Sequence, residues 1–175
     1  LAGAEFRVYE DASCGTQATT ADGSAAVFTT AADGTAGTLE MKAGTYYVKE
    51  TKAPDNFKLN GTVQAVTVES SAEAVVTVKD TPIIYGGVKV KKTDGQGTTA
   101  QGDASLAGAV FTITDASGND VKTITTGADG TASTGSTDLV EGSYTVRETK
   151  APAGYLVNST WKQSFTISEH GTVIT

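Results

Sequence analysis

The chain of 175 residues contains one cysteine, one histidine, one methionine, one tryptophan and three prolines. One cysteine excludes a disulfide within the chain. A metal site needs clustered histidine, cysteine or carboxylate ligands, and the candidates Asp94, Asp103, Asp115 and Asp120 are too scattered to form one. A hydrolytic triad needs a base oriented by an acid, and His170 lies alone in an expected hairpin turn. We therefore expect no metal, no cofactor and no enzyme.

Basic residues are also scarce, with 13 Lys and Arg against 20 Asp and Glu, for a net charge of −7. This balance argues against nucleic acid, whose binders carry basic patches, and against an anionic membrane surface. No apolar run approaches the ~20 residues that span a bilayer, so we expect no membrane insertion. The sequence has no signal peptide and opens without Met, and we interpret it as a segment of a longer protein, cut at both ends.

Thr, Gly, Val, Ala and Ser dominate the composition. β-branched residues favour strands, and Gly with Asp-Gly pairs favours turns. No apolar stripe with the period of a helix has useful length. The composition therefore predicts an all-β fold.

Three blocks of sequence occur twice, in the same order along the chain. Repeated blocks that are separated this widely indicate a duplicated domain, each copy with its own core, and not a solenoid. We expect two tandem β-sandwich domains, at residues 1–82 and 83–175. The paired blocks are 1–8 with 106–113, 29–36 with 125–132, and 50–54 with 148–152.

Short alternating runs between turn signals predict the strands of each copy. The second copy opens with an apolar and lysine-rich strand, 88–95, which has no counterpart in the first copy. The other expected strands are 6–9, 63–68 and 74–78 in the first copy, and 111–114, 165–167 and 172–175 in the second. Tight turns are expected at Asp33-Gly34, Asp129-Gly130, 116–120 and 169–171.

Strand alternation predicts several buried ionisable side chains, because residues two apart share a face. Tyr144 and Val146 share a face with Glu148, and Tyr46 and Val48 share one with Glu50. In the same way, Lys92 follows Val88 and Val90, and Asp80 follows Val76 and Val78. Each charged group thus ends an apolar row, whereas Lys89 and Lys91 point to solvent.

Burial of these groups indicates a specific chemistry. Desolvation lowers the pKa of a lysine and raises that of a carboxyl group, which gives a neutral amine that can attack a carbonyl. A second acidic group can polarise that carbonyl and shuttle the proton, and the fold supplies proximity. These are the conditions for a spontaneous isopeptide bond between a lysine and an aspartate or asparagine.

The chain resembles two tandem Cna-B-type domains (inverse immunoglobulin, prealbumin-like, SpaA-like) of Gram-positive surface adhesins and pilins. The matching residues are the run 88–94, the two Leu-Ala-Gly-Ala blocks and the run 148–155. The resemblance implies that Lys92 is the cross-linking amine of the second domain and Glu148 its catalyst. It implies that Glu50 is the catalyst of the first domain and Asp80 the carbonyl partner.

The sequence departs from the family pattern at both ends. The first copy lacks the strand that would carry its lysine. When Val76-Thr77 is aligned with Ile174-Thr175, the carbonyl partner of Lys92 falls about three residues beyond Thr175. Each residue also has a structural alternative: Lys92 as a strand-end lysine that reaches water, Glu50 and Glu148 as carboxylates that accept from backbone donors, and Asp80 as a linker turn.

The resemblance implies a structural stalk or spacer that is stabilised by isopeptide bonds, on the extracellular, cell-wall-anchored surface of a Gram-positive bacterium. Its partners would be neighbouring domains of the same surface protein. The alternative is an adhesin module that binds a host extracellular matrix protein or a glycan. Exposed aromatic residues mark binding surfaces, and the candidates are Tyr47, Phe57, Tyr85 and Trp161.

One further motif is weak. The run Cys14-Gly15-Thr16-Gln17 is similar to the Cys-Gly-Glu-Gln thioester motif of complement proteins. A thioester needs a shielded pocket, whereas this run follows a strand in a polar loop. We expect an exposed loop thiol there, and packing of Trp161 in a core or at a sheet edge.

Overall fold

The computed structural model describes residues 1–95, 102 and 104–175. Contacts divide the chain into unit 1, Leu1–Ile83, and unit 2, Ile84–Thr175. The described residues form strands and turns and contain no helix, so the expectation of an all-β chain is confirmed. Within this part of the chain, no helix of the length and apolarity needed to cross a membrane occurs.

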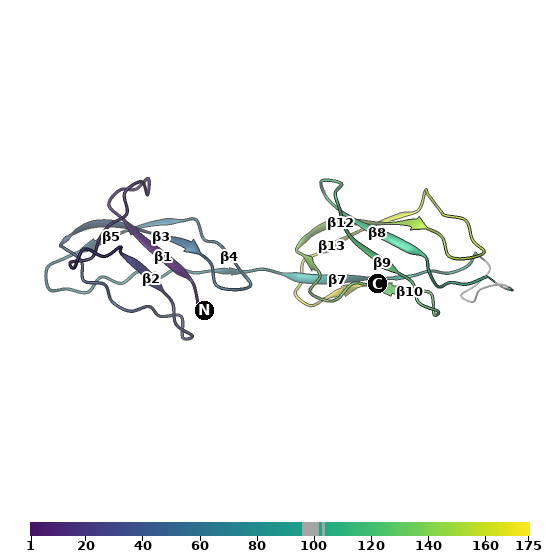
Figure 1. Cartoon of the computed structure of the whole chain (residues 1–175), viewed down its shortest axis with the longest axis horizontal. Helices are drawn as coiled ribbons and strands as arrows, with labels where there is room; N and C mark the ends of the chain where they lie inside the picture. Colours follow the sequence, from purple (N-terminus) through teal and green to yellow (C-terminus); the bar gives the residue numbers. More distant parts are fainter. Residues whose placement is uncertain (96–101, 103) are drawn as a thin grey trace. The chain divides into compact units, whose positions relative to one another are not determined.

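Unit 1 is built on one antiparallel sheet with the strand order β2-β1-β3-β5 (Figure 1). The alternating apolar residues of the strands turn toward one face of this sheet. A separate pair, β4-β6, lies near the end of the unit. The strands are β1 (Glu5–Tyr9), β2 (Val27–Thr29), β3 (Gly44–Lys52), β4 (Phe57–Lys58), β5 (Val63–Val68) and β6 (Thr81–Pro82).

Unit 2 has two sheets. One has the order β13-β12-β8-β9 (Figure 1), and in the other β7 pairs with β10 and β11 in antiparallel and with β14 in parallel. The strands are β7 (Tyr85–Lys91), β8 (Val110–Asp115), β9 (Asp120–Thr125), β10 (Thr131–Ser133), β11 (Leu139–Val140), β12 (Gly142–Lys150), β13 (Lys162–Ile167) and β14 (Val173–Ile174).

In both units, hydrogen bonds from one threonine hydroxyl group hold the backbone of the Leu-Ala-Gly-Ala block. The hydroxyl group of Thr30 donates to the carbonyl of Leu1 and accepts from the amide of Ala4. In unit 2, Thr126 does the same with Leu106 and Ala109. The hydroxyl satisfies backbone groups where the chain enters the first sheet strand, which explains why the Leu-Ala-Gly-Ala block and this threonine recur together.

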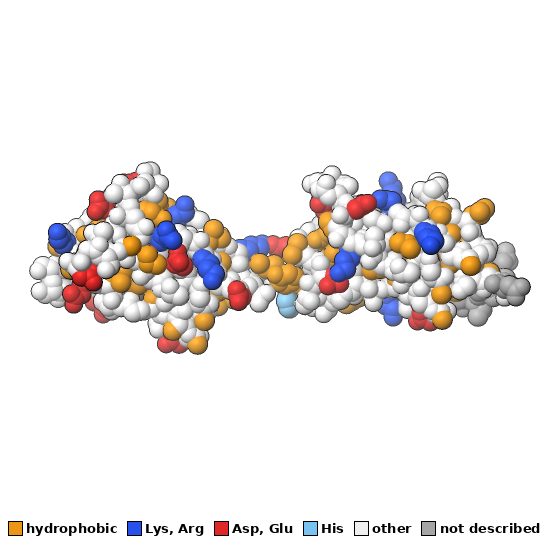
Figure 2. Space-filling view, viewed as in Figure 1, with side chains coloured by type: hydrophobic (Ala, Val, Ile, Leu, Met, Phe, Trp, Pro, Cys, Tyr) orange, Lys and Arg blue, Asp and Glu red, His pale blue; other side chains and the backbone are white. Residues whose placement is uncertain are grey.

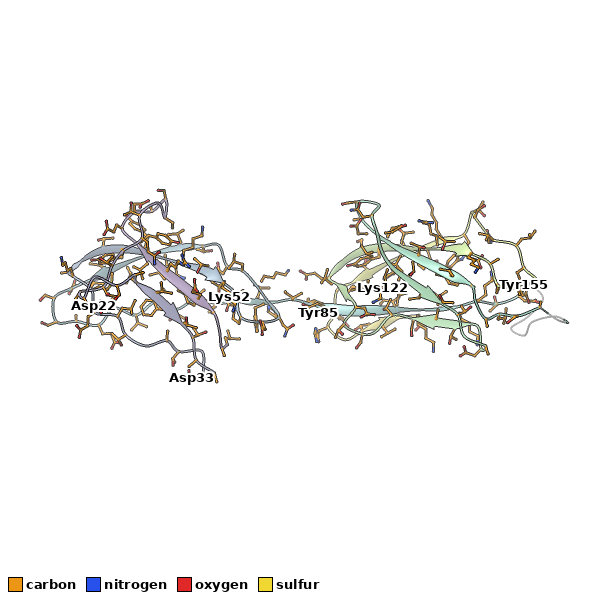
Figure 3. The ribbon with its side chains drawn as sticks, viewed as in Figure 1. Asp22, Asp33, Lys52, Tyr85, Lys122 and Tyr155 are labelled. Carbon is orange, nitrogen blue, oxygen red and sulfur yellow. The ribbon has the colours of Figure 1, made fainter. Side chains whose placement is uncertain are left out.

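The Asp-Gly turns are also built alike. Asp33 lies at the tip of a loop (Figure 3) and its Oδ1 accepts from the amide of Thr35 at 2.9 Å. Asp129 accepts from the amide of Thr131 at 3.0 Å. The intervening glycine adopts a positive φ in both turns, 83° at Gly34 and 74° at Gly130, a conformation that glycine adopts without strain.

Three strand predictions need correction. Residues 74–78 form no strand, 172–175 reduces to β14, and the run 88–95 forms β7, which starts at Tyr85 and ends at Lys91. A strand exists only where its backbone pairs with a neighbour, and β14 pairs with β7. The run 74–78 has the sequence of a strand, but among the described residues no strand pairs with its backbone.

Close packing around β7 leaves no room for a Cβ atom at Gly86 or at Gly87. A Cβ atom on Gly87 would lie 2.4 Å from the carbonyl oxygen of Gly135 and 2.7 Å from Thr134 Oγ1. We expect Gly87→Ala to lower the free energy of unfolding of unit 2 by about 1–3 kcal/mol. Urea denaturation followed by the fluorescence of Trp161, the single tryptophan, measures it. The matched control is Gly95→Ala, where a Cβ meets nothing within 4 Å; equal stability of the two variants would contradict the expectation.

Candidate functional site

Strands β3 and β12 carry the two glutamates into the interior. Along β12, Tyr144, Val146 and Glu148 are buried, with exposed fractions of 7, 1 and 5%. Glu50 on β3 is 1% exposed. The burial that was predicted from alternation is thus confirmed for both glutamates.

A β-bulge follows each glutamate. On β12 the pairing with β8 shifts between Glu148 and Lys150, so that Thr149 has no partner in the ladder. On β3 the pairing with β1 shifts in the same way, passing from Glu50 to Lys52 across Thr51. A bulge bends its strand and re-aims side chains, and bulges are common beside functional sites. Both glutamates therefore occupy the last regular position before the sheet is interrupted.

Unit 2 brings Lys92 and Glu148 together. Lys92 follows directly after β7, and its backbone amide donates to the carbonyl of Gly130 at 2.7 Å. Its Nζ lies 2.8 Å from Glu148 Oε1, with the side chains 16% and 2% exposed. Val88 and Val90 are buried while Lys89 and Lys91 are exposed, as alternation predicted. A charge that is this shielded is costly unless paired, and here each group supplies the other's partner.

Aromatic side chains and a backbone donor complete this site. A pocket of about 200 Å³ lies over the pair, and Phe111, Asn158 and Trp161 contribute to its lining. The rings of Phe111 and Trp161 meet edge to face with centroids 5.7 Å apart. The amide of Asn158 donates to Glu148 Oε2 at 2.9 Å. One oxygen of the glutamate thus faces the amine, and the other is fixed by the backbone.

Unit 1 has the same glutamate site without the amine. The amide of Asn60 donates to Glu50 Oε2 at 2.6 Å. Among the described residues, the buried atoms Glu50 Oε1 and Asp80 Oδ1 have no hydrogen-bond partner. Burial, and to a smaller degree the negative charge of Asp80, raises the pKa of Glu50 above its ordinary value, although the bond from Asn60 opposes this. Unit 1 therefore holds two neighbouring carboxyl groups that lack a cation.

Asn60 and Asn158 were not anticipated from the sequence. Each follows its glutamate by ten residues and donates its backbone amide to that glutamate. The side chain of Asn60 also donates to the carbonyl of Lys79 at 3.0 Å, which fixes the backbone next to Asp80. An asparagine at the same spacing in both copies was the signal that was available.

Among the weaker candidates, Trp161 borders the site of unit 2. Cys14 is a free cysteine in a turn, with φ of 57°. It is half-buried, whereas the sequence predicted an exposed thiol. His170 is exposed in its turn, where its Nδ1 accepts from the amide of Tyr85 at 3.4 Å. Trp161 packs on Phe111 at 36% exposure. Asp103 lies outside the described residues, and those that are described contain no cluster of three metal-ligating side chains.

A family model, described as the SpaA prealbumin-like fold domain, matches residues 1–82 and again 86–175. The chain belongs to this family. The expected resemblance and the prediction of tandem Ig-like sandwiches are confirmed, because the SpaA model matches twice and so covers nearly the whole chain. No curated protein matches it.

Several solved structures are similar to this chain. The pilus adhesin SpaC of Lactobacillus rhamnosus GG is 21% identical with a TM-score of 0.50, over 97% of this chain and 24% of that one. The Bacillus anthracis TIE protein is 30% identical with a TM-score of 0.48, over 99% and 30%. A streptococcal ancillary pilin is 22% identical with a TM-score of 0.48, over 99% and 56%. The chain thus spans between about a quarter and just over half of these proteins.

Proposed function

We propose that this chain is a stalk segment of an extracellular adhesin or pilin on a Gram-positive cell wall, in which each unit is locked by an isopeptide bond. Lys92 is the amine and Glu148 the catalyst in unit 2, and Glu50 is the catalyst and Asp80 the carbonyl partner in unit 1. Each bond forms once per molecule, so the role is structural and the chain is not an enzyme. Neighbouring domains of the same surface protein are its partners.

The contact of 2.8 Å between Lys92 Nζ and Glu148 Oε1 is the observation that carries this proposal. A stalk that only separates two ends needs no lysine against a buried glutamate, and such a pair gives weak stabilisation compared with apolar packing. The pair does supply what amide formation needs: an amine next to an acid that can take up and return its proton, in a site shielded from water.

The register of β14 supports a carbonyl partner for Lys92. In the parallel ladder, Val173 lies opposite Gly87 and Ile174 lies opposite Val88. Lys92 is four residues after Val88, so the residue opposite it is four after Ile174, which is the third position beyond Thr175. The repeat alignment assigns that same position to the counterpart of Asp80. Two independent arguments therefore agree on where an Asp or Asn would meet the amine.

The reaction is a condensation. The Nζ lone pair attacks the carboxyl carbon of an Asp, a C–N bond forms, and a C–O bond breaks. The glutamate relays the proton from nitrogen to the departing oxygen, which leaves as water; an Asn partner releases ammonia instead. Nothing is oxidised or reduced. The bond joins the first and last strands, and by analogy with disulfides that close loops of similar length it adds roughly 4–5 kcal/mol through the unfolded state.

Single-molecule pulling tests the mechanical role. The sample is a chain that continues beyond Thr175 with Asp or Asn at the third position. A locked unit 2 keeps the residues between the linked positions from extending, which hides on the order of 300 Å of contour length at roughly 3.4 Å per residue. In the Glu148→Gln variant, in which the bond does not form, we expect unfolding of unit 2 to add this contour length to the measured extension. Full extension of both proteins at similar force would refute the stalk proposal.

A further inference from the structure

Asn60 connects the two carboxyl groups of unit 1. Its backbone amide donates to Glu50 Oε2 at 2.6 Å. Its side-chain Nδ2 donates at 3.0 Å to the carbonyl of Lys79, the residue before Asp80. Its Oδ1 accepts from the amide of Thr62 at 3.1 Å. The side-chain amide group of this half-buried residue therefore ties the segment that carries Asp80 to the loop that contacts Glu50.

The chain on either side of Asp80 is held by different bonds. After Asp80, strand β6 pairs with β4, and the amide of Ile83 donates to the carbonyl of Asn56 at 2.7 Å. Before Asp80, the chain is held by side-chain amides: Gln64 Nε2 donates to the carbonyl of Thr77 at 3.2 Å, and Asn60 Nδ2 donates to that of Lys79. Of these donors, Asn60 acts on the residue next to Asp80, so its loss would free the backbone there.

The residue after Asn60 makes this side chain chemically labile. The sequence has four asparagines, and Asn60 is the one that glycine follows. The backbone nitrogen of the following residue can attack the side-chain carbonyl carbon of an asparagine. Glycine favours this ring closure because it has no Cβ in the way and its backbone reaches the required conformation easily. Gly61 is exposed, and a Cβ built on it would meet nothing within 4 Å, so neighbouring atoms do not crowd this position.

We propose that Asn60-Gly61 is a site of spontaneous deamidation, and that conversion of Asn60 releases the segment that places Asp80 near Glu50. The Gly61 nitrogen attacks Asn60 Cγ and gives up its proton, a C–N bond forms, and the side-chain nitrogen leaves as ammonia. Water then opens the succinimide ring at either carbonyl, which gives aspartate or isoaspartate. Nothing is oxidised or reduced. Neither product retains Nδ2, so the hydrogen bond to the carbonyl of Lys79 is lost, and a third carboxylate joins Glu50 and Asp80.

Unit 2 contains a matched site that lacks the glycine. Asn158 also donates its backbone amide to a buried glutamate, and its Oδ1 accepts from the amide of Trp161 at 3.2 Å. Ser159 follows it, and a side chain at this position hinders ring closure. Deamidation itself does not depend on the proposed function. Its consequence for isopeptide formation does: conversion that comes first would leave Asp80 out of place, which sets a time limit on the locking of unit 1 and none on that of unit 2.

The test incubates the folded 175-residue chain at mildly alkaline pH and follows its tryptic peptides by mass spectrometry. Peptides 59–79 and 151–162 contain one asparagine each, Asn60 and Asn158. We expect peptide 59–79 to gain the mass difference between water and ammonia at least about tenfold faster than 151–162, with fragmentation locating the change at residue 60. The control variant Gly61→Ala, which introduces no clash, should slow the reaction about tenfold. The same chain in urea gives the rate at Asn60 without the fold.

Hydrogen exchange tests the effect on the segment of Asp80. Acidic and basic side chains are interspersed on the visible face of unit 1 (Figure 2), and the net charge of the chain is −7. Anion exchange therefore separates the converted chain, which carries one more negative charge, from the parent. We expect amides in 79–83 to exchange at least about fivefold faster in the converted chain and in Asn60→Asp, because a hydrogen bond is lost. The control Asn158→Asp should leave exchange in 79–83 unchanged.

The outcomes bear on the two parts of the proposal separately. Conversion at Asn60 with faster exchange in 79–83 supports both parts. Conversion in urea but not in the folded chain shows that the fold protects the side chain, and it overturns the modification site. Conversion with unchanged exchange in 79–83 overturns the link to Asp80. None of these measurements involves an isopeptide bond, so failure of this proposal is distinguishable from failure of the proposed function.

Discussion

Glu148→Gln is expected to lower the free energy of unfolding of unit 2 by about 3 kcal/mol, near the lower end for breaking a shielded ion pair. Glutamine can still accept the hydrogen bond from Asn158, so the change removes mainly the charge that Lys92 faces. The amine is then left 16% exposed without a counter-ion. Urea denaturation followed by Trp161 fluorescence reports the loss, because that ring packs beside the site.

A double-mutant cycle separates the pair from local repacking. Lys92→Met alone leaves a buried carboxylate without its cation and should also destabilise unit 2. Lys92→Met together with Glu148→Gln should recover most of either loss, because no unpaired charge remains. A Glu148→Gln variant within about 0.5 kcal/mol of the parent, or strictly additive losses, would show that the two groups are not coupled.

The corresponding substitution in unit 1, Glu50→Gln, is expected to raise the free energy of unfolding, in contrast to Glu148→Gln in unit 2. Glu50→Gln should stabilise unit 1 by about 1–3 kcal/mol, since it removes one of two neighbouring buried carboxylates and offers a donor to Asp80. Hydrogen exchange at the β3 amides measures unit 1 by itself. Faster exchange in Glu50→Gln than in the parent at neutral pH would contradict the account.

The stability of unit 1 should also depend on pH in an unusual direction. The pKa of Glu50 is raised above 4.5, chiefly by burial, so the folded unit holds a proton that the unfolded chain releases. Its contribution is therefore present below the ordinary value and is lost as pH rises through the raised pKa. Exchange at β3 should quicken over this range in the parent, and the Glu50→Gln variant should lack this component.

The sequence predicted the features that depend on local alternation. The burial of Glu50, Glu148, Val88 and Val90 follows from a period of two, and the tandem organisation follows from the repeated blocks. The proximity of Lys92 to Glu148 was anticipated only through the family resemblance, because the two residues lie far apart along the chain and nothing local relates them.

What the sequence did not predict depends on partners in space. The run 74–78 has a strand pattern, but its strand is absent because pairing needs a neighbour. The bulges at Thr51 and Thr149 arise from the register between two strands, which neither strand encodes alone. The sequence predicted that the two glutamates are buried. It did not predict the backbone amides of Asn60 and Asn158 that donate to them, because the positions of these amides depend on the path of a loop.

The most direct test of the central claim supplies the missing carbonyl partner to Lys92. The chain is extended after Thr175 with Val-Lys-Asp-Thr-Pro, the sequence of residues 78–82, so that the added Asp falls opposite Lys92 in the ladder. Intact mass and tandem mass spectrometry of tryptic peptides are then measured for this chain and for its Glu148→Gln and Lys92→Arg variants. The account predicts a folded protein lighter by one water, with Lys92 joined to the added Asp, and no loss in either variant. A folded extended chain at its unmodified mass would contradict it.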